Sequence, residues 1–358
     1  MMSGTRLAVL SSDTFLRHAP SRPHPESPDR LRAVVEALRG DQRLSRLLRE
    51  PRRRGEEVLT LVHSEGYVRR VKALVESGAE WLDADTYLSS LSFDVALLAA
   101  SASVEAVELV LGGQCRAAFA LVRPPGHHAG PRGAAMGALT QGFCIFNNVA
   151  IAAKAALNSG LRRIAIVDLD AHHGNGTQEA FEAEPRVLYV SLHQDPATIY
   201  PGTGFPEECG LGEAAGTKVN VPLPPGASDD VYLDAIGAVA LPLIEQFKPE
   251  LVLVSAGFDA HELDPMTGLM VSTEGYLRAY ELVLGWAVRS SAGAVLCLEG
   301  GYGPALSELV LRVCRWLAFG EAPSASGSLR ESGARVLRRY EVLKRDVVRA
   351  LREYWELS

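Results

Sequence analysis

Two carboxylates and two imidazoles lie close together in the segment IAIVDLDAHHGNG, which spans residues 164–176. An apolar, β-branched run ends at Asp168, and Asp170, His172 and His173 follow it. A buried carboxylate is unfavourable unless it is paired, hydrogen-bonded or bound to a metal. Asp170 and His172 are two positions apart and therefore share one face of an extended chain. This arrangement indicates a metal site.

A further carboxylate reaches the same edge from another predicted strand. The run LVLVSAGF leads directly into Asp259. Together, Asp170, His172 and Asp259 give three protein ligands and leave a coordination position open, as catalytic zinc sites do. Zn²⁺ fits these nitrogen and oxygen donors best, although Fe²⁺ or Mn²⁺ could use the same ligands. The D-x-H spacing alone is a weak signal, because a satisfied core histidine gives the same pattern.

Two more strand ends carry groups suited to proton transfer. The loop RPPGHHAG contains His127 and His128, and a neutral histidine can accept a proton from water and return it to a leaving group. The segment LEGGYG places Tyr302 after two glycines, which allow a sharp turn of the backbone. Each of these residues could instead serve loop structure or packing. In an open α/β sheet, however, ligands bind outside the carboxyl ends of the strands, where all four segments converge.

The scaffold must bring several strand ends to one edge. Short apolar runs alternate with helical patterns, which predicts a mostly parallel sheet covered on both faces. We expect strands at residues 7–10, 58–62, 118–122, 164–168, 187–192, 251–255 and 294–298. We expect helices near residues 28–38, 93–111, 145–157, 229–247, 273–288 and 304–319, and a C-terminal helix after residues 320–333.

Composition narrows the class of protein further. The chain has 358 residues, 47% of them hydrophobic, but no apolar run of 18 or more and no signal-peptide pattern, so we expect no membrane association. Its net charge of -7 argues against constitutive nucleic-acid binding. Five dispersed cysteines favour reduced thiols in a cytoplasm.

We expect one domain over residues 1–358, with a catalytic core near 5–320 and a C-terminal helical extension near 328–356. An oligomer is compatible with this sequence.

Six motifs resemble the metal-dependent histone deacetylase family: RPPGHHA, GFCIFNNVAIAA, VDLDAHHGNGTQEAF, YPGTG, SAGFDAHELDPMTGL and LEGGYG, in this order. The resemblance extends from HPESPDRL at His24 to roughly Phe319. Within the family, the Asn of HHGNGTQ and the Glu of LEGGYG resemble the class II branch and its bacterial relatives. The resemblance implies an arginase/deacetylase-like three-layer α/β/α sandwich, a zinc ion, a structural potassium ion and removal of acyl groups from lysine side chains or small acyl amines.

The resemblance also implies a role for each chemical group. His127 and His128 become the tandem catalytic histidines, Asp168 orients His127, and Asn175 contacts His128. Asn175 is neutral where the class I pattern has a carboxylate, so His128 should be held less strongly as a cation. Tyr302 matches the catalytic tyrosine. The zinc ligands implied by the match are Asp170, His172 and Asp259.

A narrow acyl-lysine tunnel is the next feature that the resemblance implies. Phe143 and Tyr200 match its aromatic walls, and Gly301 lies along its side. The usual aromatic residue before PGTG is Phe, so Tyr200 adds a hydroxyl. Asp85 aligns loosely with a rim residue that holds the substrate backbone. An inner potassium site, supplied mainly by backbone carbonyls, matches Asp168, Asp170, His172, Ser191 and Leu192.

Two positions bear on how the class II pattern applies. Leu169 stands where class II members often carry Trp, a change that we do not expect to abolish activity. In polyamine-selective relatives, a glutamate follows the Asp-Pro after the zinc aspartate, whereas Met266 occupies this position here. A thioether offers an adaptable apolar contact in place of a charge. We therefore expect acyl-lysine, or an acyl amide without a distal cation, to be preferred, unless Glu262 or Asp85 supplies the missing carboxylate.

Three alternative functions differ in what they require. An acetylpolyamine amidohydrolase would need a carboxylate near the mouth of the site to hold a second amine. A binuclear manganese ureohydrolase would need more carboxylates than the His-Gly-Asn after His172 provides. An inactive acyl-lysine binding module would be expected to lack Tyr302 or a metal ligand, and both are present.

Overall fold

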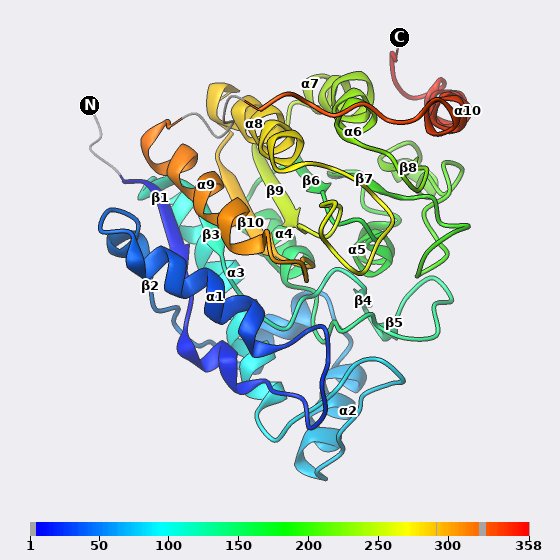
Figure 1. The fold of residues 1–358 in the computed structure, drawn as a ribbon. Helices are drawn as coiled ribbons and strands as arrows, with labels where there is room; N and C mark the ends of the chain where they lie inside the picture. The colour runs from blue at the N-terminus through cyan, green and yellow to red at the C-terminus, as the bar shows by residue number, and fades with distance from the viewer. Residues whose placement is uncertain (1–4, 291, 322–326, 358) are drawn as a thin grey trace.

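The centre of the protein is an eight-stranded sheet whose neighbouring strands all run parallel (Figure 1). The computed structural model describes residues 5–290, 292–321 and 327–357. The strands are β1 (Thr5–Leu10), β2 (Leu48–Arg49), β3 (Cys115–Ala120), β6 (Ile164–Asp168), β7 (Val187–Gln194), β8 (Lys218–Leu223), β9 (Leu251–Ala256) and β10 (Ala294–Leu298). Their order is β2-β1-β3-β10-β9-β6-β7-β8, and β4 (Ala129–Gly130) pairs with β5 (Gly133–Ala134) apart from the sheet.

Helices cover both faces of this sheet (Figure 1). One layer contains α1 (Pro28–Gly40), α6 (Asp229–Ala235), α7 (Leu241–Phe247), α8 (Thr273–Ser290) and α9 (Leu306–Phe319). The other layer contains α3 (Ser92–Leu111) and α4 (Asn148–Asn158), with α2 (Glu65–Glu76) and α5 (Asn175–Phe181) beside them. The C-terminal helix α10 (Ala334–Leu351) packs against β8. The α/β class and the three-layer sandwich expected from the sequence are confirmed.

Shorter helical segments complete the chain. Four are 3-10 helices, η1 (Asp13–Arg17), η2 (Ser45–Leu47), η3 (Glu56–Leu61) and η4 (Gly212–Ala214). A π-helical turn, η5 (Ile236–Ala240), joins α6 to α7, so the helix expected over residues 229–247 is continuous but not uniform.

Six of the seven expected strands are present, and the strands at 164–168 and 294–298 have the expected bounds. The strand expected at 58–62 is wrong, because this segment forms the helix η3. Val58 and Leu59 are buried beside residues of α2 and α3. A short apolar run fits a buried helical turn as well as a strand, so periodicity does not separate the two.

Strand β8 had no clear sequence signal, because Lys218 and Asn220 interrupt its apolar residues. Both side chains are nevertheless buried. The Lys218 ammonium group donates hydrogen bonds to the carbonyl oxygen of Val187 at 2.8 Å and to the hydroxyl of Thr217 at 2.6 Å. These hydrogen bonds make a buried ammonium group tolerable. The residue types alone did not reveal them, so the strand was missed.

The parallel arrangement directs the carboxyl ends of β3, β6, β9 and β10 to one edge of the sheet (Figure 1). Asp168 is the last residue of β6 and is in register with Ser255 of β9 and Ser191 of β7. All residues of β6, β9 and β10 are buried. The segments that follow these strands therefore start from rigid positions, which suits a site that depends on exact placement of side chains.

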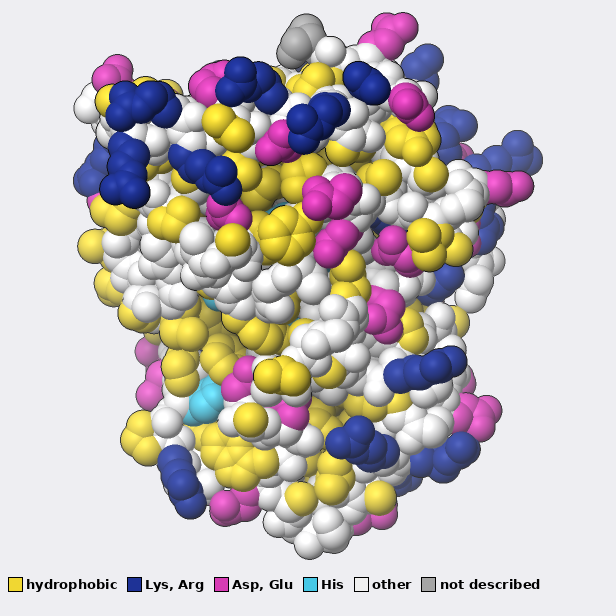
Figure 2. Space-filling model, turned by 90° about the vertical axis from the view of Figure 1, so that its right-hand side faces the viewer, with side chains coloured by type: hydrophobic (Ala, Val, Ile, Leu, Met, Phe, Trp, Pro, Cys, Tyr) yellow, Lys and Arg dark blue, Asp and Glu magenta, His cyan; other side chains and the backbone are white. Residues whose placement is uncertain are grey.

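Figure 2 shows that Lys and Arg side chains gather along the upper part of one face, while hydrophobic and acidic side chains are interspersed across its middle.

Among the helices that the structure describes, none has both the length and the apolar character required to cross a membrane. The expected C-terminal helix is present as α10, although part of the preceding segment, residues 322–326, lies outside the described residues.

Candidate active site

Asp170, His172 and Asp259 meet at the edge where β6 and β9 end. One potential ligand atom from each lies within 4.8 Å of the others. The Nδ1 nitrogen of His172 is 3.2 Å from Oδ1 of Asp170 and 2.8 Å from Oδ2 of Asp259. The remaining carboxylate oxygens are already occupied, because Asp170 Oδ2 accepts from the N–H of Gly300 at 2.8 Å and Asp259 Oδ1 accepts from the N–H of Ala171 at 2.7 Å. The imidazole nitrogen and one oxygen of each carboxylate therefore converge and form a candidate cation site, in which Oδ1 of Asp170 also accepts from the backbone N–H of His172 at 3.0 Å.

The charges of this cluster also suit a cation. Burial would lower the pKa of His172, but the hydrogen bonds to Asp170 and Asp259 outweigh burial and raise it to about 10. The two carboxylates are fully buried and need a positive partner. A proton on His172 provides that charge, and a divalent cation held by the same three atoms would replace the proton. Two carboxylates and one imidazole form a donor set that Zn²⁺ accepts.

His127 and His128 follow β3, and their ring centroids are 4.0 Å apart. The Nδ1 nitrogen of His127 is 3.1 Å from Oδ2 of Asp168, whereas the Nδ1 nitrogen of His128 is 2.8 Å from the amide oxygen of Asn175. These are the contacts that the sequence predicted. Asp168 is itself fixed, because Oδ2 also accepts a hydrogen bond from the Tyr189 hydroxyl at 3.0 Å.

The two histidines have opposite charge preferences. Burial opposes a charge on His127, but the carboxylates of Asp170 and Asp168 outweigh it and raise the pKa of His127 to about 10. Burial lowers the pKa of His128 well below its usual value, and the nearby charges of His127 and His172 lower it further. His128 is therefore the neutral member of the pair and the one able to accept a proton.

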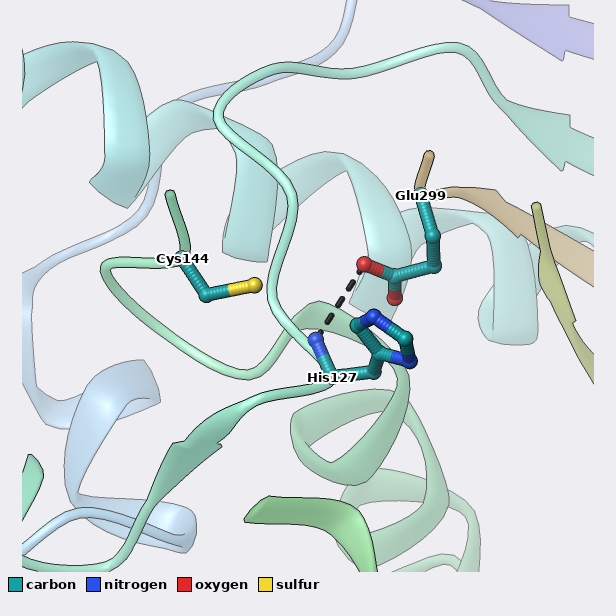
Figure 3. Close-up of side chains that lie close together, drawn as sticks. All are labelled: His127, Cys144 and Glu299. Atoms are coloured by element: carbon teal, nitrogen blue, oxygen red, sulfur yellow. Dashed lines mark hydrogen bonds between the residues drawn. The ribbon is translucent and has the colours of Figure 1, made fainter. Parts of the chain in front are cut away.

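Glu299, which the sequence analysis left without a role, supports the histidine loop. Its Oε2 accepts hydrogen bonds from the backbone N–H groups of Gly126 at 2.7 Å and His127 at 3.1 Å. Figure 3 shows this carboxylate beside the His127 backbone nitrogen, with the Cys144 thiol directed toward the same space. His127, Cys144 and Glu299 also offer ligand atoms within 4.8 Å of one another. Burial raises the pKa of the Cys144 thiol well above its usual range, so this side chain is a neutral thiol.

A cavity of about 240 Å³ opens beside the candidate metal cluster and the tandem histidines. Tyr302 lines it, and burial raises the pKa of its phenol well above the usual range, so the hydroxyl remains a hydrogen-bond donor. The Phe143 ring lies edge-on to the Tyr302 ring with centroids 5.8 Å apart. The lining residues are Asp85, Pro125, His127, His128, Gly142, Phe143, Asp170, His172, Tyr200, Met266, Gly300 and Tyr302.

The residues expected to form a tunnel line this cavity, except that the neighbouring glycine takes the place of Gly301. Gly300 lines it, whereas Gly301 does not; Gly301 has a φ of +119°, and a Cβ there would approach Phe258 and Leu306 to 3.0 Å. The Tyr200 hydroxyl donates to the carbonyl oxygen of Thr140 at 2.8 Å, which accounts for the extra hydroxyl.

Gly142 is a lining residue that sequence reasoning missed. It has a φ of +50°, and a Cβ at this position would lie 2.5 Å from Cδ2 of His128 and 2.8 Å from the Tyr200 ring. Glycine is therefore required both by the backbone conformation and by the space beside the histidine.

The residues expected to hold potassium come from β6, from β7 and from the segment that follows β6. Asp168 and Ser191 are paired in register between β6 and β7, and Leu192 follows in β7. All three are fully buried, and the Ser191 hydroxyl is 2.8 Å from Nδ1 of His193. Asp170 and His172, the other two residues of the set, belong to the candidate metal cluster.

Comparison with known proteins shows to which family the chain belongs. The histone deacetylase domain profile matches residues 24–317, which include every residue of the metal cluster and the cavity. The chain belongs to the histone deacetylase family. A probable deacetylase of Archaeoglobus fulgidus is 42% identical over 300 residues, covering 82% of this chain and 80% of that protein. A histone deacetylase-like amidohydrolase of Pseudomonas aeruginosa is 36% identical over 285 residues, covering 79% of this chain and 73% of that protein.

The structural comparison agrees with the sequence comparison. The crystal structure of the HDA15 HD domain matches with a TM-score of 0.84 at 34% identity, covering 97% of this chain and 96% of that chain. The family resemblance and the deacetylase-like α/β fold expected from the motifs are therefore confirmed. As a member of the histone deacetylase family, this chain is a hydrolase of the deacetylase type.

Proposed function

We propose that this protein is a zinc-dependent deacetylase that hydrolyses the acyl amide of a modified lysine side chain or of a small acyl amine. The observation that carries the proposal is a single cavity lined by two metal-ligating residues, the neutral His128 and the phenol of Tyr302. These are the groups that metal-assisted amide hydrolysis requires.

Asp170, His172 and Asp259 would hold the catalytic ion, with Zn²⁺ the best fit and Fe²⁺ an alternative for the same donors. When bound, the ion supplies a Lewis acid that polarises an amide carbonyl and lowers the pKa of water. A structural K⁺ is proposed at the buried segment of Asp168, Ser191 and Leu192, on the basis of the family resemblance.

His128 is proposed as the base. The Asn175 oxygen accepts from its Nδ1–H, so Nε2 carries the lone pair that removes a proton from the attacking water. The same nitrogen then returns the proton to the departing amine. His127, kept cationic by Asp168, supports the negative charge that develops beside it.

Tyr302 is proposed as the donor to the developing oxyanion. Its hydroxyl stays protonated and needs no rearrangement at the moment of attack, which is the property of a preorganised oxyanion site. Collapse of the tetrahedral species breaks the C–N bond and yields a carboxylate and a free amine.

The lining of the cavity favours an acyl-lysine over an acetylated polyamine. Met266 lines the cavity. By the family resemblance, it stands where polyamine-selective relatives carry a glutamate. Glu262 is not among the lining residues and forms an ion pair with Arg330. Asp85 does line the cavity, where its two oxygens accept hydrogen bonds from the Thr140 hydroxyl at 2.6 Å and the Thr86 hydroxyl at 3.0 Å. An acetylpolyamine amidohydrolase is the alternative, with Asp85 as the carboxylate that would support it.

We also propose that the whole chain acts as one catalytic unit, with α10 as an extension beyond the family domain. The free cysteines, Cys115, Cys144, Cys209, Cys297 and Cys314, support a reducing compartment such as a cytoplasm as its place of action.

The decisive test uses protein stripped of metal and reloaded with one equivalent of Zn²⁺. We expect hydrolysis of a fluorogenic acetyl-lysine peptide to appear on loading and to be lost on chelation. An inactive binding module would bind the peptide without turnover, and a ureohydrolase would require two metal equivalents. Either of these results would overturn the proposal.

A further inference from the structure

The motif HPESPDRL, residues 24–31, has no role in the mechanism above. It leads into α1, which begins at Pro28. Glu26 lies just before the helix and is fully buried, while Arg30 projects from the first turn with only 6% of its side chain exposed. The two side chains meet, since Arg30 Nη1 donates to Glu26 Oε1 at 3.2 Å.

Glu26 is held rigidly by partners from distant parts of the chain. Arg123, which precedes the tandem-histidine loop, donates from Nε to Oε1 and from Nη2 to Oε2, each at 2.7 Å. The Tyr87 hydroxyl donates to Oε2 at 2.9 Å. Paired donors of one guanidinium fix both the position and the plane of a carboxylate. Glu26 is therefore a fixed, ionised anchor inside the protein.

Arg30 connects this anchor to the loop that carries Tyr302. Its Nη2 donates to the carbonyl oxygen of Glu299 and its Nε donates to that of Gly301, each at 2.7 Å. Its guanidinium carbon lies 4.3 Å from the centroid of the Tyr302 ring. The two carbonyls bracket the glycine pair that precedes Tyr302, which is the most freely rotating part of this loop.

The opposite side of the same loop is held by carboxylates. Gly300 donates its N–H to Asp170, and Tyr302 and Gly303 donate theirs to Oδ2 of Asp264 at 2.6 and 2.9 Å. Arg30 thus holds the carbonyl groups while Asp170 and Asp264 hold the N–H groups. Removing Arg30 would take the donor away from the Glu299 and Gly301 carbonyls, and only the Gly300 carbonyl between them would keep a hydrogen bond among the described residues, from the N–H of Phe258 at 3.1 Å.

We propose that Glu26 is a positioning residue for catalysis: it holds the Arg30 guanidinium against the Glu299 and Gly301 carbonyls and the Tyr302 ring, and thereby fixes the phenol at the reacting carbonyl. The inference rests on the proposed function of Tyr302. Glu26 and Arg30 do not line the cavity, so they act through Tyr302 and not on substrate.

The test measures kcat and KM of Glu26→Gln and Arg30→Met in the zinc-loaded enzyme, each with Tyr302 present and in a Tyr302→Phe background. A small misplacement of a catalytic group can cost roughly 10²-fold in rate. With Tyr302 present, we expect kcat to fall roughly 10- to 100-fold while KM and zinc content change little. In the Tyr302→Phe background, we expect less than about a twofold further loss, because the group being positioned is already absent.

Arg32→Met is the matched control, since Arg32 lies on the same helix with about half of its side chain exposed and pairs with Asp29 on the surface. Glu26→Gln leaves Arg123 without its counter-ion and could fail to fold, in which case Arg30→Met decides, because it keeps the pair of Glu26 and Arg123 intact. Equal losses in the two backgrounds, or an unchanged kcat, would overturn the inference. A normal kcat for Tyr302→Phe alone would instead overturn the proposed role of Tyr302.

Discussion

The Nδ1 nitrogen of His128 lies 2.8 Å from the amide oxygen of Asn175. An amide oxygen only accepts hydrogen bonds, so His128 carries a proton on Nδ1, and the lowered pKa of His128 leaves Nε2 unprotonated. The carboxylate of Asp168 lies at the equivalent place beside His127 and favours the protonated, cationic form of that histidine. Two adjacent histidines thus acquire different charges from one neutral and one ionised neighbour.

Asn175→Asp should change the pH dependence of the reaction. A carboxylate beside His128 favours the imidazolium and raises the pKa of His128. Because the base works only when unprotonated, the acid limb of kcat/KM should move to higher pH, by roughly one unit or more. Profiles of the zinc-loaded enzyme check this, with Asn158→Asp at the exposed end of α4 as the control. An acid limb that stays in place would remove His128 from the role of base.

His128→Ala should reduce kcat more than His127→Ala. The lowered pKa of His128 keeps this residue unprotonated at neutral pH and so able to accept a proton, whereas the raised pKa of His127 keeps it protonated and suits an electrostatic role. Loss of a general base lowers the rate by roughly 10²–10⁴-fold. Steady-state kinetics at neutral pH, with zinc content measured for each variant, would show the order. The reverse order would mean that the two roles are exchanged.

Tyr302→Phe should keep the fold and the metal but lose catalysis. The change removes one hydroxyl that acts on charge formed only in the transition state. By comparison with the loss of an oxyanion donor elsewhere, kcat should fall roughly 10²–10³-fold while KM changes little. Tyr354→Phe, at an exposed tyrosine, is the control. A loss below about threefold would exclude Tyr302 from the mechanism.

Asp170→Asn and Asp259→Asn should each weaken metal binding severely. Either change removes a negative charge from a cluster with three protein donors. Elemental analysis after dialysis should show well under one equivalent of zinc per chain, and turnover should fall with it. Asp94→Asn, at a half-exposed carboxylate paired with Arg53, should retain the full equivalent. A fully loaded, active Asp259→Asn enzyme would contradict the ligand assignment.

Much of this site could be predicted because its residues follow buried parallel strands. Asp168 ends β6 and Asp259 follows β9, and adjacent parallel strands deliver their ends to one edge. The contacts of His127 and His128 with Asp168 and Asn175 were implied by the family resemblance and not by the strand pattern, and the structure contains both.

Contacts that depend on distant segments gave no such signal. Glu26 and Arg123 are 97 positions apart, and nothing in either local sequence pairs them. The 58–62 segment was misassigned for a related reason, because packing by α2 and α3 decides whether an apolar run is extended or helical. Local pattern therefore predicts which residues meet at the candidate site better than it predicts which residues hold them in place.

The substrate preference should depend on Met266. This side chain lines the cavity at the position where a glutamate would hold the distal amine of a polyamine. A thioether cannot stabilise that cation, and Asp85, the lining carboxylate outside the candidate metal cluster, already accepts hydrogen bonds from Thr86 and Thr140. We therefore expect kcat/KM to be higher for an acetyl-lysine peptide than for N-acetylputrescine or N8-acetylspermidine.

Met266→Glu should shift the ratio of these kcat/KM values toward the polyamines, whereas Met266→Gln, of similar size but without charge, should not. A wild-type preference of tenfold or more for the polyamines, about 1.4 kcal/mol in transition-state binding, would show that Asp85 or another carboxylate serves in place of the glutamate.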